Sequence, residues 1–342
     1  SSVKVWLPYL RGGSGTDTFT SLLARALEER GHRAVASRYS RIWETVPFAL
    51  SAVRAPAGAD VVLANSWNAF AFRRRGIPLV AVEHHCVFDP AFRPHRSPQQ
   101  AIFHEVLLRR FERASFRAAT VVVGVSDYTS RSVAAAFPGT KPISILNGID
   151  TAHFTPAKSQ EARSGRPFRL LFVGNLIRRK GADLLPRIMS ALGPDFELRF
   201  TSGLRDEARI EVLPNMRPLG RITPPELLEE YRQADVLLFP SRLEGFGYAV
   251  AEAMACGVPV VASNTSSLPE LVDDGETGRL CVPEDPGSFV QAVRELAGDP
   301  QRRVSMGVAA RARAVERFSL RRMASEYQGL LDSIRVATGA DV

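Results

Sequence analysis

The sequence lacks several features that would place it in a special class of protein. No apolar run approaches the ~20 residues that a membrane-spanning helix needs, and the start, SSVKVWLPYL, lacks the charged-then-apolar order of a signal peptide. Cysteine is scarce, since Cys86, Cys256 and Cys281 are odd in number, scattered and without metal-ligand spacing. A disulfide scaffold and a cysteine-based metal centre are therefore not expected. We predict a protein of the reducing cytoplasm.

Acidic residues are in short supply in only one half of the chain. Residues 1–150 hold 19 Lys or Arg against 11 Asp or Glu, a balance of +8, whereas residues 151–342 hold 25 against 25. The excess predicts that the first half meets something anionic, such as a membrane face, an anionic acceptor or nucleic acid. The alternative is a solvated, arginine-rich surface without a partner. Composition alone does not decide between the two.

Strand and helix patterns alternate along the whole chain. Short β-branched runs such as VKVWLPYL, ADVVLANS and TVVVGVS are separated by helical stretches, which indicates parallel sheets with right-handed crossovers. The pattern breaks at 147–167, a polar stretch with two prolines that is typical of a linker, and it restarts at FRLLFVGN. We therefore predict an α/β protein with two doubly wound, Rossmann-like domains and a ligand crevice between them.

Two glutamates mark the strongest candidate site. Glu244 lies in the loop after the buried strand pattern ADVLLFPS, and Glu252 lies further on, in a helix predicted over 248–255. Between them, Gly245 and Gly247 let the backbone approach a ligand closely, and free N–H groups at a helix start suit a phosphate. Carboxylates accept strong hydrogen bonds from vicinal hydroxyls. The pattern predicts a site for a phosphate-bearing, hydroxyl-rich ligand at the carboxyl ends of parallel strands.

Three further segments hold candidate residues. A glycine-rich turn at 11–17, RGGSGTD, separates the first strand from the first helix, although a plain tight turn would have the same sequence. The segment VGNLIRRKG at 173–181 follows the first strand of the second half and offers cations for a phosphate-rich ligand. The segment VAVEHHCVFD at 80–89 places two histidines at a strand end, without the further ligands that a metal site would need.

The stretch 240–278 resembles the signature region of family 4 glycosyltransferases, which are retaining enzymes of the GT-B fold that use nucleotide-activated sugars. It contains P-S-x-x-E-G-F-G, the Glu-x7-Glu spacing and E-A-M-A-C-G-x-P-V-V-A-S, and weaker echoes cover nearly all of the chain. The resemblance implies two Rossmann-like domains that face an interdomain cleft. Residues 1–150, joined by a C-terminal helix at about 320–342, would bind the acceptor, and residues 151–319 would bind the nucleotide sugar.

The resemblance also implies roles for single residues. The groups expected to act in catalysis are Glu244 near the donor sugar, His84 close to the same sugar and Lys180 at the pyrophosphate. Glu252 would accept hydrogen bonds from the ribose hydroxyls. The residues expected to bind the donor and its nucleotide are Gly13, Gly15, Asn175, Arg179, Lys180, Arg221, Ile222, Glu244, Gly245, Phe246, Gly247, Tyr248 and Glu252.

Two positions depart from the family's pattern. Asn175 stands where the family has an arginine, so Arg178 or Arg179 would have to supply that charge. In TSSLPELV, Ser266 and Ser267 stand where the family has its first glycine, so the close approach of backbone that glycine allows is not predicted there.

The resemblance implies a metal-independent hexosyltransferase without a cofactor. It would move a hexose from a UDP- or GDP-linked sugar to a hydroxyl of a glycan, a lipid-linked acceptor or a small molecule, with retention at the anomeric carbon. One alternative is a sugar-nucleotide epimerase on the same fold, which needs no acceptor. Another is a non-enzymatic protein that binds nucleic acid, but the sequence contains no recognisable recognition helix.

A helix predicted over 99–118 combines an apolar face with a run of arginines. The apolar face holds Phe103, Leu107 and Phe111, and the adjoining faces hold Arg109, Arg110, Arg113 and Arg117. With Phe88 and Phe92 as exposed aromatic side chains, this region could touch an anionic bilayer, where many relatives meet lipid-linked acceptors. The alternative is a helix that packs on the core and leaves its arginines in solvent.

Overall fold

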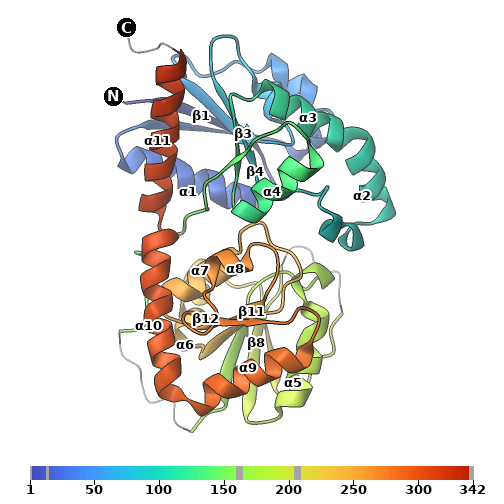
Figure 1. Ribbon diagram of the computed structural model, residues 1–342, viewed down its shortest axis with the longest axis vertical. Coiled ribbons are helices and arrows are strands. Elements are labelled where there is room, and N and C mark those ends of the chain that lie inside the picture. The colour runs from blue at the N-terminus through green and yellow to red at the C-terminus, as the bar shows by residue number, and fades with distance from the viewer. Residues whose placement is uncertain (1, 13–14, 159–164, 204–208, 339–342) are drawn as a thin grey trace. The chain divides into compact units, whose positions relative to one another are not determined.

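The computed structural model describes the chain except for residues 1, 13–14, 159–164, 204–208 and 339–342. The chain divides into two compact units, one formed by residues 1–148 with 319–342 and the other by residues 149–318. Helices and strands alternate in both units (Figure 1). Each unit is built around its own parallel sheet, and each is described by itself below.

The sheet of the first unit has the strand order β2-β1-β3-β4-β5-β6, and all pairs are parallel. Its strands are β1 (Lys4–Leu10), β2 (Arg33–Tyr39), β3 (Val61–Asn65), β4 (Leu79–Glu83), β5 (Val121–Gly124) and β6 (Ile143–Ser144). Its helices are α1 (Gly15–Glu29), α2 (Pro98–Phe103), a π-helical turn (His104–Leu108), α3 (Arg109–Ala118), α4 (Asp127–Ala136) and α11 (Leu320–Thr338). Short 3-10 turns lie at Arg41–Glu44, Pro47–Ala52, Ala69–Phe72 and Pro90–His95.

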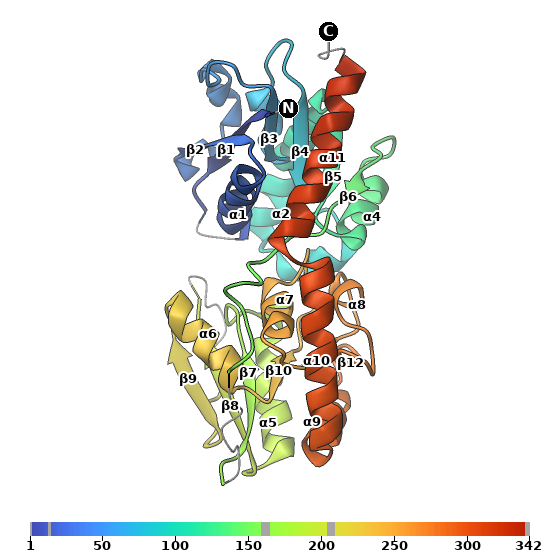
Figure 2. The same cartoon turned by 90° about the vertical axis from the view of Figure 1, so that its left-hand side faces the viewer.

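The core of the first unit forms because both faces of its sheet are covered. All five residues of β4 are buried, as expected for a parallel strand between two helical layers. α11 returns to this unit and packs against α1, as Figure 2 shows, with the ring of Tyr327 6.2 Å from that of Phe19. On the described residues, no helix is long and apolar enough to cross a bilayer.

The sheet of the second unit has the order β12-β11-β10-β7-β8-β9 and is also parallel throughout. Its strands are β7 (Phe168–Phe172), β8 (Phe196–Thr201), β9 (Met216–Gly220), β10 (Val236–Phe239), β11 (Val260–Ser263) and β12 (Gly278–Cys281). Its helices are α5 (Leu185–Leu192), α6 (Pro224–Gln233), α7 (Tyr248–Ala255), α8 (Leu268–Leu271), α9 (Pro286–Gly298) and α10 (Pro300–Arg317), with 3-10 turns at Arg178–Lys180 and Ala182–Leu184. The strand order reverses between β7 and β10, where doubly wound sheets bind their ligands.

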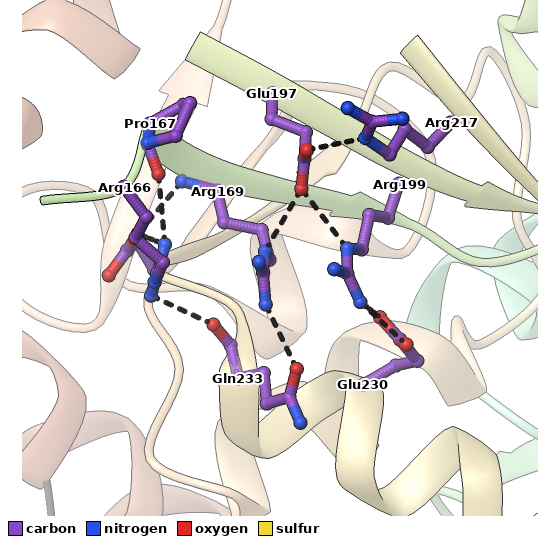
Figure 3. A network of polar contacts seen from close by, with 9 residues as sticks. Arg166, Pro167, Arg169, Glu197, Arg199, Arg217, Glu230 and Gln233 are labelled. Carbon is purple, nitrogen blue, oxygen red and sulfur yellow. Dashed lines mark hydrogen bonds and ion pairs between the residues drawn. The ribbon is translucent and has the colours of Figure 1, made fainter. Parts of the chain in front are cut away.

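A polar network ties α6 to the three strands at one edge of this sheet (Figure 3). Glu197 on β8 accepts from three arginines, with N···O distances of 3.2 Å to Arg169, 3.1 Å to Arg199 and 2.7 Å to Arg217. Arg199 also lies 3.0 Å from Glu230 on α6. α6 has one buried side chain among its described residues, Tyr231, so ion pairs replace much of the usual apolar contact.

The helix predicted over 99–118 forms, but a π-helical turn interrupts it. Its buried side chains are His104, Leu108, Glu112, Ser115 and Phe116. The predicted apolar face of Phe103, Leu107 and Phe111 is only half-buried. The buried face therefore lies one residue later than predicted, and a histidine and a glutamate are in the core.

The prediction of exposed aromatic side chains beside this helix is wrong. Phe88 is buried, with its ring 5.5 Å from that of Phe137, and Phe92 packs against the same core. The guanidinium of Arg109 lies 4.2 Å from the centre of the Phe88 ring, so one of the predicted surface arginines covers that aromatic instead.

Candidate functional site

Two loops leave the switch point of the second sheet and carry the strongest candidates. The loop after β7 ends in the turn Arg178–Lys180, and the loop after β10 contains Glu244. Because β7 and β10 are adjacent and parallel, both loops emerge at the same edge of the sheet. Gly181 lets them touch, since its φ is +75° and a Cβ there would lie 2.0 Å from the carbonyl oxygen of Pro240. Only glycine fits this crossing.

Lys180 and Glu244 form a largely buried ion pair where these loops meet. Lys180 Nζ lies 2.6 Å from Glu244 Oε1, and their side chains are 18% and 7% exposed. Ser241 Oγ donates to the same carboxylate oxygen at 2.6 Å. Arg179 Nη1 donates to the carbonyl oxygen of Leu243 at 2.9 Å, which holds a second cation against the Glu244 loop.

Burial and charge oppose each other in the pKa values of this pair. Burial raises the pKa of Glu244, but the charges of Lys180 and Arg179 outweigh it and leave the pKa below its ordinary value. Burial lowers the pKa of Lys180, and the Glu244 carboxylate opposes that shift only in part. Glu244 is therefore ionised at neutral pH. Two cations thus surround one carboxylate. An incoming anion can compete with that carboxylate for the two cations.

Glu252 has a different environment, one helix away. It lies on α7, which begins after Gly247 at φ +104°, and its Oε2 accepts a 2.8 Å hydrogen bond from Tyr231 Oη. Burial raises the pKa of Glu252 to about 7, against the lowering effect of the Tyr231 hydrogen bond. Phe246 and Tyr248 pack edge to face at the start of the helix, with ring centres 5.3 Å apart. Glu252 can therefore gain or lose a proton near neutral pH.

Ser266 stands at the position where the sequence lacks a glycine. Its φ is +52°, in the left-handed region that favours glycine. Its Oγ accepts a 2.9 Å hydrogen bond from the N–H of Glu244, and the next hydroxyl, Ser267 Oγ, donates to the carbonyl oxygen of Phe246 at 2.8 Å. The backbone thus makes the turn without glycine, and two serine hydroxyls hold the Glu244 loop in place.

We expect two replacements of Ser266 to separate backbone strain from this hydrogen bond. Ser266→Ala keeps the strain and leaves the N–H of Glu244 without its acceptor, which should lower the free energy of unfolding by ~1–3 kcal/mol. Ser266→Gly loses the same hydrogen bond but relieves strain of ~1 kcal/mol, so it should be the more stable of the two. Urea unfolding of both variants measures the difference. Equal stabilities would show that the left-handed turn costs nothing.

The structure distinguishes between the two arginines that could replace the family arginine at Asn175. Arg178 is exposed, whereas Arg179 is held against the Glu244 loop. Asn175 itself packs on the end of β8, because a Cβ at Gly203 would lie 1.4 Å from Asn175 Oδ1. The short asparagine and Gly203 thus fit one another.

Arg221 and Ile222 follow β9, at the far edge of the second sheet. Arg221 is exposed and Ile222 is half-buried. One strand, β8, separates β9 from β7, whose loop carries Lys180, and both β7 and β8 separate β9 from β10.

In the first unit, His84 directly follows β4. Its ring packs edge to face on Phe19 of α1, with centres 4.6 Å apart, and burial lowers its pKa to about 4. The imidazole is therefore neutral at pH 7. Gly15, the first residue of α1, lies about one helical turn before Phe19. Gly13 lies outside the described residues.

Sequence reasoning missed a buried pair of carboxyl groups next to His84. Glu83 and Glu112 are 1% and 0% exposed, and Ser66 Oγ donates to Glu112 Oε1 at 3.1 Å. Burial raises the pKa of Glu83 to about 7 and the pKa of Glu112 well above its ordinary value. The charge of Glu83 adds to the effect of burial on the pKa of Glu112, so Glu112 keeps its proton near neutral pH. This pair fixes α3 to the end of β4.

The candidate residues therefore form one group in each unit. Lys180, Arg179 and Glu244 meet in the second unit, and His84 lies against α1 in the first. Within the described residues, no group of three or more His, Cys, Asp or Glu side chains is placed to hold a metal ion.

Two family models together match most of the chain. The model for Glycosyl transferases group 1 matches residues 154–313, and the model for Glycosyltransferase Family 4 matches residues 34–153. Alpha-maltose-1-phosphate synthase of Mycolicibacterium smegmatis is 30% identical over 314 residues, which cover 81% of this chain and 80% of that protein.

D-inositol 3-phosphate glycosyltransferase of Paenarthrobacter aurescens is 35% identical over 199 residues. That match covers 52% of this chain and 48% of that protein, so the chain spans about half the length of this relative. Among solved structures, sucrose-phosphate synthase from Thermosynechococcus elongatus matches with a TM-score of 0.82 at 20% identity, over 98% of this chain and 100% of that chain. This likeness confirms the predicted GT-B fold of two Rossmann-like domains.

Proposed function

Because the chain belongs to the Glycosyl transferases group 1 family, we propose that it moves a hexose from a UDP- or GDP-linked sugar to a hydroxyl group. The observation that carries this proposal is the buried Lys180–Glu244 pair at the switch point of the second sheet, with Arg179 beside it. Cations placed there neutralise the charge that develops on a departing nucleoside diphosphate, and they do so without a metal ion.

Donor binding is assigned to the second unit, within residues 151–319. Lys180 and Arg179 bind the pyrophosphate, and the backbone from Gly245 to Tyr248 approaches it at the start of α7. Glu252 accepts hydrogen bonds from the ribose hydroxyls. Asn175, in the loop after β7 that also carries Lys180, is assigned to a phosphate oxygen, and Arg221 and Ile222, which follow β9 at the sheet edge, are assigned to the nucleotide.

The sugar is assigned to Glu244, His84 and the glycine-rich turn with Gly13 and Gly15. A neutral imidazole at His84 can donate or accept a hydrogen bond to a sugar hydroxyl without placing a charge beside the anomeric carbon. As the diphosphate leaves, positive charge develops on the sugar, and nearby anionic oxygens stabilise it. Attack by the acceptor hydroxyl on the same face gives retention, as in the family.

Acceptor binding is assigned to the first unit, where residues 1–150 carry the whole charge excess of +8 (19 Lys or Arg against 11 Asp or Glu). The names of the three relatives described above each contain a phosphorylated acceptor or product: inositol 3-phosphate, maltose 1-phosphate and sucrose phosphate. We therefore favour an acceptor that carries an anionic group. A glycan, a lipid-linked acceptor and a small molecule all remain chemically compatible with that description.

A panel of UDP-, GDP-, ADP- and dTDP-sugars tests this function directly. We expect one donor to raise the midpoint of thermal unfolding by mass action, and the same donor to be consumed when acceptors are added. Consumption or epimerisation of the donor with no acceptor present would instead favour the epimerase alternative. A midpoint of thermal unfolding that no sugar nucleotide raises would reject the proposal.

We further propose that the first unit makes peripheral contact with an anionic membrane on the cytoplasmic side. Phe88 and Phe92 do not serve as anchors, but Ile102 and Val106 are 66% and 51% exposed and lie four residues apart on one helical stretch. The exposed Arg110 follows one turn later. Exposed apolar residues beside cations are typical of surfaces that lie on anionic lipid.

Vesicle sedimentation tests the membrane contact. We expect binding to rise with the content of anionic lipid and to fall with salt. The double variant Ile102→Ser/Val106→Ser should bind about tenfold more weakly, because it removes two aliphatic side chains that would insert into the lipid. The matched control is Val304→Ser/Val308→Ser, two exposed valines four residues apart on α10 of the other unit. Equal loss in both double variants, or no dependence on anionic lipid, contradicts the contact.

A further inference from the structure

A pocket of about 650 Å³ opens in the first unit, away from every candidate residue for sugar transfer. Its walls are the last turns of α3, the start of β5 at Thr120 to Val122, and the connection from α4 to β6 at Phe137 to Ile143. Because the strands of this sheet are parallel, the start of β5 lies at the amino edge, whereas His84 follows the carboxyl end of β4. The pocket is therefore a separate site.

Three cations and no acid line this pocket. They are Arg113 and Arg117, four residues apart on α3, and Lys141 from the α4–β6 connection. All three are exposed, and none of them has a hydrogen bond or ion pair with another described residue. Arg109, one turn earlier on α3, differs because it pairs with Glu105 at 3.0 Å. Like charges without counter-ions from two segments create a positive potential that an anion would relieve.

The inner wall of the pocket is apolar. Phe116, Phe137 and Val122 are 8%, 5% and 7% exposed, and the two rings pack edge to face with centres 5.0 Å apart. Ile143, at the rim, is 43% exposed. The hydroxyl-bearing side chains of Thr120 and Thr140 also line the cavity. An apolar wall under a cationic rim suits a ligand with one strongly anionic end and one apolar end.

We propose that this pocket binds an organic phosphomonoester, with its phosphate at Arg113, Arg117 and Lys141 and its organic part on Phe116 and Phe137. Guanidinium groups match the geometry of phosphate oxygens, and a phosphomonoester carries close to two negative charges at neutral pH. The size of the cavity accommodates such a ligand, since pockets for small molecules measure roughly 300–1,000 Å³. A soluble phosphate ester and the head group of a phosphatidic acid share this chemistry.

Calorimetric titration of the full chain with phenyl phosphate tests the site. We expect Arg113→Gln/Arg117→Gln/Lys141→Gln to weaken binding about tenfold or more, because charge-assisted hydrogen bonds supply most of the affinity. The matched control, Arg33→Gln/Arg54→Gln/Arg75→Gln, removes three exposed cations of the same unit that do not line the pocket, and it should bind as the parent does. Inorganic phosphate should bind more weakly than phenyl phosphate, because it cannot use the apolar wall.

Vesicles with and without phosphatidic acid separate the two sources of ligand. Recruitment that is lost in the pocket variant, kept in the control and competed by phenyl phosphate assigns the pocket to a lipid head group. Recruitment that is unchanged in the pocket variant, together with lost binding of phenyl phosphate, assigns it to a soluble ester. Equal affinity of both triple variants for phenyl phosphate overturns the proposal, whatever the vesicles show.

Discussion

Replacing Lys180 with alanine is expected to lower turnover with the nucleotide sugar by about 10²–10³-fold. The ammonium lies 2.6 Å from Glu244 where the loops after β7 and β10 meet, and we propose that it binds the pyrophosphate. Loss of one preorganised group that stabilises developing negative charge typically has an effect of this size. Steady-state kinetics with the donor found in the panel measures it, and the loss should fall mainly on kcat.

The control for this prediction is Arg178→Ala, from the same turn. Arg178 is exposed, while its neighbour Arg179 is bound to the Glu244 loop, so Arg178→Ala should retain near-parent turnover. Among the groups that lower the pKa of Glu244, Lys180 has the largest effect, and Lys180→Ala removes it. The free energy of unfolding should therefore fall at pH values above the ordinary pKa of a glutamate, where the Glu244 carboxylate loses its partner. Unfolding curves must therefore accompany the kinetics. Parent-like kcat in a folded Lys180→Ala protein would contradict the assigned role.

The fold, and the contact between the loops after β7 and β10, could be predicted from the pattern of apolar and polar residues in the sequence. Alternating buried strands and helices predict doubly wound sheets, and the helix predicted over 248–255 is α7 in the structure. Once β7 and β10 are neighbours, the loops that follow them must share an edge. That geometry brings Lys180 and Glu244 together from positions 64 residues apart.

Features that depend on three-dimensional packing could not be predicted in this way. A buried histidine and glutamate on the stretch 98–118 look like surface residues in a hydropathy pattern, and the π-helical turn at His104–Leu108 has no strong local signal either. The spacing of Leu108, Glu112 and Phe116 was the only available hint. Glu112 is tolerated in the core because burial and the neighbouring Glu83 raise its pKa and keep it protonated, and because Ser66 Oγ donates a hydrogen bond to it.

The backbone conformation of Ser266 also could not be predicted from the sequence. The resemblance places a glycine at Ser266 or Ser267, but serine rarely adopts a positive φ, so the sequence did not predict that Ser266 itself takes the left-handed conformation. The hydrogen bond from the N–H of Glu244 to Ser266 Oγ helps to offset the strain, but that partner lies 22 residues away in sequence. Such a compensation becomes visible only when both loops are placed in space.

Glu252→Ala is expected to weaken donor binding by about one to two orders of magnitude. A carboxylate that accepts hydrogen bonds from the ribose hydroxyls contributes ~1.5–3 kcal/mol, and alanine removes it entirely. The matched variant is Glu226→Ala on α6, an acid of the same unit that caps its own helix through Thr223. It should bind the donor as the parent does, although its helix is less stable. Calorimetric affinity that is unchanged in Glu252→Ala rejects the ribose assignment.

The pH dependence of donor binding gives the sharper test of Glu252. Burial raises its pKa to about 7, so the carboxylate needed by the ribose is mostly present at pH 8 and mostly protonated at pH 6. Affinity should therefore fall about tenfold as pH drops from 8 to 6. The neighbouring titratable groups stay neutral over this range, because burial raises the pKa of Cys256 to about 12 and that of Tyr231 well above its ordinary value.

The raised pKa of Glu252 has the opposite effect on the stability of the protein without ligand, which is higher at low pH. Between its ordinary value of 4.5 and about 7, the unfolded chain releases the Glu252 proton before the folded chain does, so stability falls as pH rises through this window. Donor binding restores the ionised form and must release that proton. Titrations at pH 7 in buffers of different ionisation enthalpy count the protons released. Glu252→Gln should abolish both the release and the tenfold change in affinity, and proton release that persists in Glu252→Gln would place the titrating group elsewhere.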